Sequence, residues 1–520
     1  MERPEDSGPS SEPSLGDPLG WDRQATWCLV LLVLGALLSL VWWSQDVFDP
    51  ENDACMYIQV ARNLLAGEGF TLLGEPFGVR PPGFSVLIAP LMAIWGTHVP
   101  ALNLFVNLFG VACIALLFAH TRARLGSPIA LALSVLLWIN PGFRSLCNQI
   151  MSDVPGMGLA LGCLLLERSW RPSGPRRAML LGIAIGLAGL VRTLNLLLVP
   201  SILAATYLRR GDTRDSRVRG LLMILGTLLV SAPWSVRNAR TDFTTPAEQT
   251  FVHSYGAGMF HQDARDPNSP SVPWDEIVAR APAQLSGTVR ALGSRFGAGE
   301  LSTSAAWLGS LSLLCIALVA LRRKEPAEFL CLGLLVIVAL YFAFDDRLVL
   351  PIFVLGLPAV AEVSRSLLSR IWPGRAWTTW VMVAGLAGLG LFDLTWMPDL
   401  RNLEAHARSM ERLAGHVEEQ IPAGVPIGMR VGGELAVYSE ERTIYSMHFV
   451  TRPGSWRFMD PFLEERGIDH CVFFEPVRDE ASLSPSGRRK KRRADQIRSF
   501  LRASFREVGQ FDGWWIYERR

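Results

Sequence analysis

Charged residues are scarce in this chain of 520 residues. Asp, Glu, Lys and Arg make up only 19% of it, hydrophobic residues make up 50%, and the mean hydropathy is +0.25. This balance lies far outside that of ordinary soluble proteins. The formal net charge of +2 is close to neutral and indicates no particular charged partner. The composition therefore predicts a polytopic α-helical membrane protein.

Several common site signatures are missing as well. The eight cysteines include no CxxC pair, which disfavours a zinc or redox centre. His253 and His261 have no third ligand spaced nearby, so we interpret them as ordinary polar residues. No GxGxxG or P-loop pattern occurs, and Gly432-Gly433 is no substitute for one. The sequence thus disfavours a nucleotide bound in a Rossmann-type site.

The amino-terminal segment 1–24 is rich in Pro, Ser, Asp and Glu, which predicts a short disordered tail. A secretory signal begins with basic residues, whereas this tail is acidic. The apolar stretch 25–43 follows and ends in Trp42-Trp43, a residue type that favours membrane interfaces. We expect this stretch to remain as a membrane anchor.

Further apolar stretches bring the expected number of membrane spans to roughly eleven at ~20 residues each, and some are short enough to need tilting or extension. After 25–43 they lie at 98–119, 128–140, 151–166, 178–191, 193–208, 220–236, 304–321, 327–344, 348–363 and 377–397. The apolar stretch 83–95 follows a proline pair and is expected to lie along the interface.

Basic residues gather in every second connection between these spans, which gives a topology independent of hydropathy. They are Arg122, Arg124, Arg168, Arg171, Arg176, Arg177, Arg209 to Arg219, Arg322, Arg323, Lys324, Arg365, Arg370 and Arg375. The positive-inside rule places these connections and the amino terminus in the cytoplasm. Segments 45–97, 237–303 and 398–520 are then extracytoplasmic. The polar, proline-rich segment 237–303 shows no clear period and is expected to be a functional or a disordered loop.

The same topology collects polar side chains at the outer ends of the spans. These are Asp53, Tyr57, Arg80, Asp153, Arg192, Arg237 and the segment Asp345-Asp346-Arg347. Each has an ordinary explanation, since arginines anchor span ends and Asp53, Ser152 and Asp153 suit helix N-caps. A helix from about 52 to 65 would put Asp53 and Tyr57 on one face, with Ile58, Ala61 and Leu65 available to lie on lipid. Two separated carboxylates among several arginines on one side favour a polar cavity at the outer membrane surface.

The motifs around these residues resemble those of the GT-C superfamily of membrane glycosyltransferases. The similarity is greatest to the bacterial branch related to protein O-mannosyltransferases and the aminoarabinose transferase of lipid A, and it covers most of 25–397. It rests on Asp53 with Tyr57, Ala61 to Leu64, Gly67 to Phe70, Arg80-Pro81-Pro82, Ser152 to Pro155, Gly186 to Arg192, Pro233 to Asn238, and Arg347 to Pro351. Many members carry Asp-Glu in the first outer loop, whereas here Ala54 follows Asp53.

The resemblance implies an inverting transfer of a sugar from a polyprenyl-phosphate donor to a hydroxyl on a lipid, glycan or protein, at the outer face of the cell membrane. Asp53 would act as the base and Asp153 as its catalytic partner or an acceptor contact. Arg80, Arg192 and Arg347 would bind the donor phosphate, and Tyr57 and Arg237 the substrate. This scheme requires no cofactor, although an acid-lined cavity leaves a divalent cation open.

Residues 398–520 have the composition of a soluble domain. The sequence predicts a helix at 402–420, strands at 425–431, 442–446, 470–474, 505–511 and 514–518, a helix end at 461–466 and a basic helix near 492–503. This order indicates a small α/β domain. In an outward-facing domain, the basic run 488–493 favours a solvated face or anionic lipid over nucleic acid.

Two other classes of protein fit part of the pattern. A secondary transporter also has many spans, but its charges lie near the bilayer midplane and its sequence often repeats, whereas no repeat is apparent here. A membrane sensor would use the carboxy-terminal domain as its working part.

Overall fold

The computed structural model describes most of the apolar bundle and parts of the carboxy-terminal domain. The described residues are 21–44, 53–72, 75–171, 174–211, 213–241, 259–262, 269–297, 302–341, 346–373, 385, 400–429, 435, 437–439, 444–446, 463–464, 467–474, 499, 501, 503–511 and 514–520. All of the expected span 377–397 except residue 385, the basic run 488–493 and most of the tail 1–24 lie outside them.

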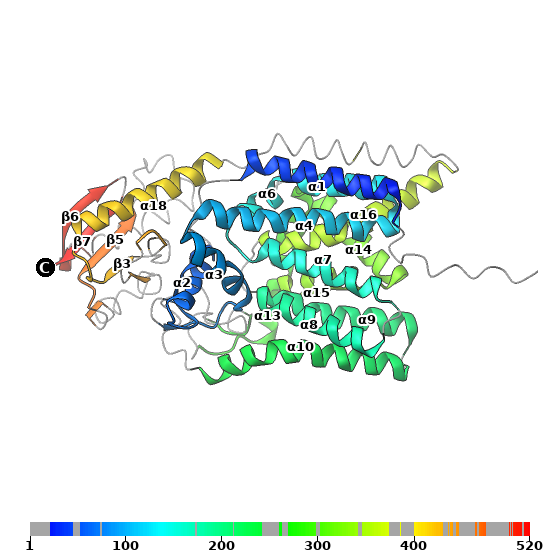
Figure 1. The fold of residues 1–520 in the computed structure, drawn as a ribbon, viewed down its shortest axis with the longest axis horizontal. Helices are drawn as coiled ribbons and strands as arrows, with labels where there is room; N and C mark the ends of the chain where they lie inside the picture. The colour runs from blue at the N-terminus through cyan, green and yellow to red at the C-terminus, as the bar shows by residue number, and fades with distance from the viewer. Residues whose placement is uncertain are drawn as a thin grey trace, which may run out of the picture.

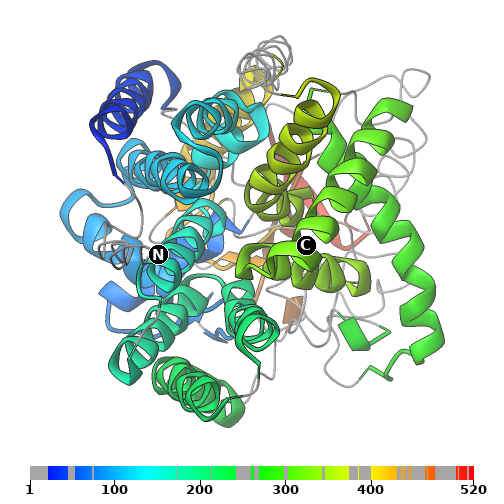
Figure 2. The same cartoon turned by 90° about the vertical axis from the view of Figure 1, so that its right-hand side faces the viewer.

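Long apolar helices run side by side along the longest axis of the molecule, and Figure 2 shows the bundle from one end. They are α1 (Arg23–Trp43), α4 (Val99–Leu125), α5 (Ser127–Ile139), α7 (Asp153–Ser169), α8 (Pro175–Val191), α9 (Leu198–Arg210), α10 (Arg214–Arg240), α14 (Thr303–Arg323), α15 (Pro326–Leu340) and α16 (Val349–Ile371). Large apolar side chains such as Leu31, Leu108, Leu229 and Leu314 stay exposed on the outside of this bundle. Such a surface suits contact with lipid chains.

The first ten expected spans each coincide with one of these helices, the sixth with the 3-10 turn η1 (Thr193–Leu197) followed by α9. Among the described residues, only α1, α4, α10, α14 and α16 are long and apolar enough to cross a membrane by themselves. The bent pair of α5 and α6 (Pro141–Cys147) adds a sixth span if it crosses as one unit. The shorter helices fall below the length of a simple span, so the number eleven stays a prediction.

Two short helices cover one end of the bundle (Figure 1). They are α2 (Ala54–Leu65) and α3 (Gly83–Trp95), joined through β1 (Thr71–Leu72) and β2 (Glu75–Pro76). The expectation that Ile58 and Ala61 lie on lipid is wrong, because both are fully buried against the bundle. The apolar face of α2 therefore packs on protein, and only the last residue of that face, Leu65, is exposed.

Segment 237–303 holds a helix that the sequence analysis did not predict, α13 (Trp274–Ser294). It packs against α14 and α15 and buries Ile277, Ala291 and Leu292. Pro282 lies inside α13, and further prolines lie near the helix in the sequence. Because proline usually breaks a helix, the sequence pattern did not indicate one here.

In the described part of the carboxy-terminal domain, the first helix and the strands follow the predicted order, whereas most of the predicted helix end at 461–466 and of the basic helix near 492–503 lies outside the described residues. Helix α18 (Leu400–Gln420) precedes a five-stranded sheet ordered β4-β3-β5-β7-β6, with bounds β3 (Ile427–Met429), β4 (Ile444–Ser446), β5 (His470–Phe474), β6 (Phe505–Phe511) and β7 (Trp514–Arg519). Strand β3 is parallel to β4 and β5, and β7 is antiparallel to β5 and β6. The domain lies at the end of the bundle that carries α2 and α3 (Figure 1), and Arg62 of α2 donates a hydrogen bond to the carbonyl oxygen of Val437 at 3.1 Å.

Candidate active site

Asp53 lies at the start of α2 but does not cap the helix with its side chain. It occupies the N-cap position and makes no side-chain capping bond. Its carboxylate instead accepts a hydrogen bond from Arg80 Nη2 at 2.7 Å and lies 3.7 Å from Arg347 Nη1. Burial alone would raise the pKa of the Asp53 carboxyl, but the charges of Arg80 and Arg347 outweigh burial and hold the pKa below its ordinary value. Asp53 is therefore an ionised carboxylate.

Arg80 is positioned by the turn that enters α3. Pro81 and Pro82 restrict the backbone, and Gly83 begins the helix. A Cβ atom on Gly83 would lie 2.6 Å from the carbonyl of Leu190 at the end of α8. Only glycine allows this close approach, which brings the turn and its arginine onto the bundle.

Asp153 and Arg192 form a second ion pair in the lining of the same cavity. Asp153 is the first residue of α7, and its Oδ1 lies 2.8 Å from Nη1 of Arg192, at the end of α8. Gly156, one turn into α7, leaves the space for this arginine, since a Cβ there would lie 2.8 Å from Arg192 Cβ and 2.9 Å from its Cδ. The pair thus depends on a missing side chain.

Tyr57 connects the two carboxylate-bearing elements. Its hydroxyl shares a hydrogen bond of 2.9 Å with Ser152, the residue before Asp153. Its ring packs edge-on against Phe84 of α3 at 4.9 Å between centroids. Because Tyr57 is 3% exposed, this bond lies in a dry environment that strengthens it.

Arg347 lies between two cavities. It belongs to the short helix η2 (Asp346–Leu348), and its Nη1 lies 3.2 Å from Met151 Sδ. The first cavity, of about 400 Å³, is lined by both carboxylates, the three arginines and Tyr57, and its remaining wall includes Leu194, Leu196, Leu197, Ile337 and Leu348. The second cavity, of about 340 Å³, is lined by Gly142, Ser145, Leu146, Gln149, Arg295, Asp346 and Arg347.

The charged groups lining the first cavity leave an excess of positive charge. Arg80, Arg192 and Arg347 carry three positive charges, and Asp53 and Asp153 carry two negative ones. The arginines form one end of a space whose other wall is apolar. Such a space suits an anion attached to a hydrocarbon chain.

Arg237 is the one predicted site residue that the structure does not bring to this cavity. Its guanidinium donates hydrogen bonds to the carbonyls of Phe77 and Phe70 at 2.6 Å and 3.0 Å. It also lies over the rings of Phe70 and Trp234, at 5.6 Å and 4.9 Å from their centroids. In this position Arg237 fastens the segment before Arg80 to α10.

Sequence reasoning missed the apolar wall of the cavity and Tyr341, which also lines it. Leucines and isoleucines carry no chemical signal in a sequence that is half hydrophobic. Among the described residues, no group of three His, Cys, Asp or Glu side chains is arranged to hold a metal ion.

A helical membrane bundle with this acid and arginine cavity at one end, beside a small α/β domain, has the GT-C fold of membrane glycosyltransferases. The family model described as "Dolichyl-phosphate-mannose-protein mannosyltransferase" matches residues 79–236. ArnT from Cupriavidus metallidurans bound to undecaprenyl phosphate is similar in structure, with a TM-score of 0.62, 15% identity and coverage of 95% of this chain and 98% of that one.

A second similar structure is the oligosaccharyltransferase AglB from Archaeoglobus fulgidus, in complex with an inhibitory peptide and a dolichol-phosphate. Its TM-score is 0.55 at 14% identity, and the match covers 87% of this chain and 70% of that one. No curated protein matches the sequence. The similarity therefore establishes the fold alone.

Proposed function

We propose that this protein transfers a sugar from a polyprenyl-phosphate donor to a hydroxyl group of a lipid, glycan or protein, with inversion at the anomeric carbon. The observation that carries the proposal is the convergence of Arg80, Arg192 and Arg347 at one end of a cavity with an apolar wall. The similar structures of ArnT and AglB hold undecaprenyl phosphate and a dolichol-phosphate, respectively. A lipid phosphate fits this cavity in charge and in polarity.

In the reaction, the acceptor oxygen attacks the anomeric carbon and forms a new C–O bond. The bond between that carbon and the phosphate oxygen breaks, and the polyprenyl phosphate leaves with the electron pair. The hydroxyl proton passes to the Asp53 carboxylate. The arginines stabilise the charge that develops on the leaving phosphate, a role that a fixed cation performs best away from water. Attack from the face opposite the phosphate inverts the anomeric centre.

Donor binding also changes the basicity of the Asp53 carboxylate. In the free protein Arg80 and Arg347 lie on Asp53 and hold the pKa of its carboxyl low, so it is a weak base. A phosphate that accepts hydrogen bonds from these arginines draws them away, and the pKa of Asp53 then moves up towards its ordinary value. The carboxylate becomes a stronger base when the donor is present.

Asp153 acts as the partner of Arg192 in this scheme, because it accepts the charge of that arginine at 2.8 Å. Both carboxylates are paired with arginines, so the arginines supply the cationic charge and we propose that the transfer needs no metal. A transfer rate that survives EDTA supports this, and a rate abolished by EDTA and restored by a divalent ion contradicts it.

We place the site on the extracytoplasmic face of the cell membrane, with the carboxy-terminal domain on the same side. The site and that domain share one end of the bundle, and Arg124, Arg171, Arg209 and Arg323 lie at the other. The excess of basic residues at that other end supports the placement.

The test is sugar transfer in membranes that contain a radiolabelled polyprenyl-phosphate sugar. Asp53→Asn keeps the shape of the side chain and removes its basicity, so we expect a loss of about 10²- to 10⁴-fold, the usual contribution of a general base. Asp215→Asn is the matched control, since Asp215 is an exposed carboxylate at the opposite end of the bundle. Undiminished transfer by a well-expressed Asp53→Asn protein contradicts the role of Asp53. Absence of transfer by the unmodified protein from every such donor contradicts the proposed function.

A further inference from the structure

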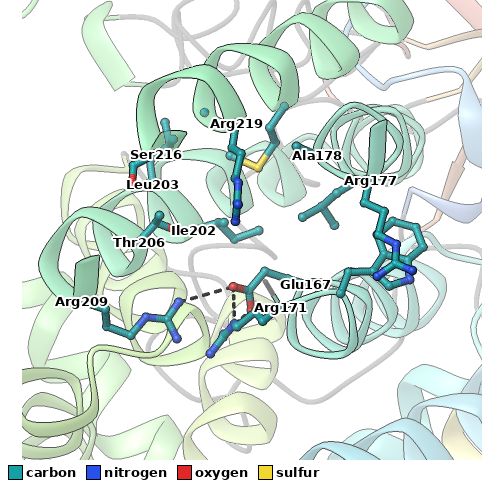
Figure 3. Close-up of a pocket in the computed structure, with 14 residues that line it drawn as sticks. Glu167, Arg171, Arg177, Ala178, Ile202, Leu203, Thr206, Arg209, Ser216 and Arg219 are labelled. Carbon is teal, nitrogen blue, oxygen red and sulfur yellow. Dashed lines mark hydrogen bonds and ion pairs between the residues drawn. The ribbon is translucent and has the colours of Figure 1, made fainter. Parts of the chain in front are cut away.

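A cavity at the end of the bundle opposite the candidate site has no role in the proposed transfer. It opens between the last turns of α7 and α9 and the first turns of α8 and α10. Figure 3 shows Arg171, Arg209 and Arg219 reaching towards the same space from different helices. The cavity thus gathers cationic side chains at the level where a bundle of this kind meets lipid headgroups.

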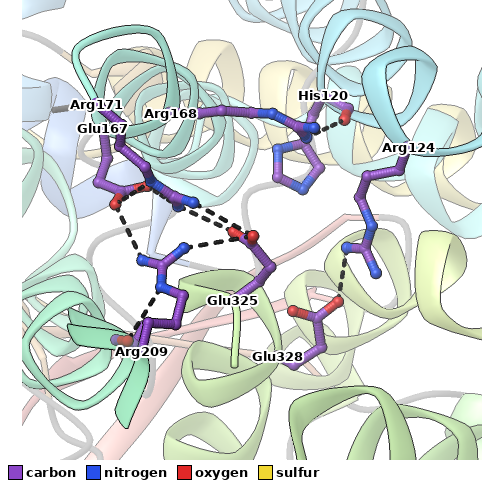
Figure 4. A network of polar contacts seen from close by, with 9 residues as sticks. His120, Arg124, Glu167, Arg168, Arg171, Arg209, Glu325 and Glu328 are labelled. Atoms are coloured by element: carbon purple, nitrogen blue, oxygen red, sulfur yellow. Dashed lines mark hydrogen bonds and ion pairs between the residues drawn. The ribbon is translucent and has the colours of Figure 1, made fainter. Parts of the chain in front are cut away.

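A closed set of ion pairs forms one side of this cavity (Figure 4). Arg171 Nη2 lies 2.9 Å from Glu325 Oε2, and Arg209 lies 3.3 Å from Glu325 and 3.4 Å from Glu167. Arg171 also pairs with Glu167. Two glutamates offset two arginines here, so this network is electrically neutral and fixes the ends of α7, α9 and α15 relative to one another.

Two further arginines line the cavity outside this network. Arg219 pairs with Asp215, whose side chain is 62% exposed, so this pair is worth little in water. Arg177, in the first turn of α8, has no ion-pair partner among the described residues. The amino-terminal ends of α8 and α10 add the positive ends of two helix dipoles to the same region. The cavity therefore carries an uncompensated positive charge.

The rest of the lining is apolar and aromatic. Leu181, Ile202, Leu203 and Met223 form the wall that continues into the bundle, and Trp170 lies at the rim. The cavity volume is about 60 Å³. One water needs roughly 10–15 Å³ by this measure, so the space holds about four to six waters and is large enough for a phosphate group.

We propose that this cavity binds the phosphate group of an anionic phospholipid from the leaflet opposite the candidate site. Arg177 and Arg219 would donate to the phosphate oxygens, and an acyl chain would lie along Leu181, Ile202 and Met223. Basic pockets between membrane helices are known to favour anionic headgroups for these reasons. The site is distinct from the sugar-transfer cavity, and it stands whether or not the transfer proposal holds.

The test compares lipid binding by two variants, each of which lacks one of two neighbouring arginines of α8. Arg177→Gln removes the unpaired charge at the cavity, and Arg176→Gln is the matched control, because Arg176 is also exposed but does not line the cavity. Each protein is placed in phosphatidylcholine nanodiscs that contain a small fraction of phosphatidylglycerol, and native mass spectrometry counts the phosphatidylglycerol retained. Each variant loses one positive charge from the same helix, so diffuse attraction to an anionic bilayer surface affects the two variants alike.

We expect the unmodified protein and Arg176→Gln to retain phosphatidylglycerol, and Arg177→Gln to bind it about tenfold more weakly, the low end for loss of a hydrogen bond between charged groups. Equal retention by both variants overturns the proposal. Retention of phosphatidylcholine to the same extent as phosphatidylglycerol also overturns it, because the cavity would then accept any phospholipid. Displacement of all retained lipid by inorganic phosphate would show a site for the free anion, and it too overturns the assignment to a lipid.

Discussion

Replacing Gly156 by alanine tests whether the space in α7 sets the position of Arg192. The new Cβ would lie 2.8 Å from Arg192 Cβ and 2.9 Å from its Cδ, closer than carbon atoms pack, so the arginine has to move. Its pair with Asp153 spans only 2.8 Å, and a small displacement breaks it. We expect lower transfer activity together with lower stability.

The control is Gly162→Ala on the same helix, where a Cβ meets nothing within 4 Å. Both variants gain the helix propensity of alanine over glycine, roughly 0.5–1 kcal/mol. This gain cancels in the comparison. The difference in the free energy of unfolding between the two variants is therefore the overpacking cost, about 1–3 kcal/mol, together with the loss of the Asp153–Arg192 pair.

The activity difference has a separate scale, since a misplacement of about 1 Å at a phosphate-binding arginine costs up to roughly 10²-fold in rate. The measurements are thermal unfolding in detergent and sugar transfer from a radiolabelled polyprenyl-phosphate donor. Gly162→Ala should be at least as stable as the unmodified protein and fully active. If Gly156→Ala matches it in both respects, the close contact does not position Arg192, and the reasoning about this pair is wrong.

Two further predictions concern the other charged groups. Because Arg80 and Arg347 hold the pKa of the Asp53 carboxyl below its ordinary value in the free protein, Asp53 stays ionised in mild acid, and kcat/KM should fall only as the pH drops through this lowered pKa. Arg347→Met removes a cation 3.7 Å from the carboxylate, so the acid limb of the pH–rate profile should move to higher pH, and an unmoved limb contradicts the assignment. At the opposite end, Arg124 lies 2.7 Å from Glu328, which is fully buried. Arg124→Met leaves that carboxylate unpaired and should lower the free energy of unfolding by about 3–5 kcal/mol, whereas adding Glu328→Met should restore most of it. Thermal unfolding of the single and double variants checks this, and a single variant as stable as the double one contradicts it.

The sequence predicts the helices of the bundle well because a membrane helix needs a long apolar run whatever its neighbours are. The sequence also predicts which helix ends lie together, since basic residues mark one end of the bundle. Asp53, Arg80, Asp153, Arg192 and Arg347 were found because charge near an apolar run is costly without a partner or a use. These signals are local, so a single sequence carries them.

The signals that failed depend on tertiary contacts. Ile58 and Ala61 were expected on lipid, but the period of an amphipathic helix does not say whether its apolar face meets lipid or protein. Arg237 carries the same charge as Arg192 and also ends a predicted span, yet it contacts backbone carbonyls and aromatic rings. Only the fold distinguishes an arginine that lines the cavity from one that holds a loop.

The arrangement around Asp53 explains how a single acid in the first outer loop can work. Ala54, where relatives often carry a second acid, is fully buried against the bundle, and a carboxylate there would lose its hydration without gaining a partner. The second carboxylate of the cavity comes instead from Asp153 on α7, and the bond between Tyr57 and Ser152 holds α2 and α7 together beside it. Asp53 pairs with Arg80 and Arg347, and Asp153 pairs with Arg192. In the proposed reaction, a donor phosphate can therefore draw arginines from Asp53 while Asp153 keeps Arg192 in place. In the proposed reaction, the separation of the two acids therefore lets the pKa of Asp53 change while the ion pair of Asp153 and Arg192 stays in place.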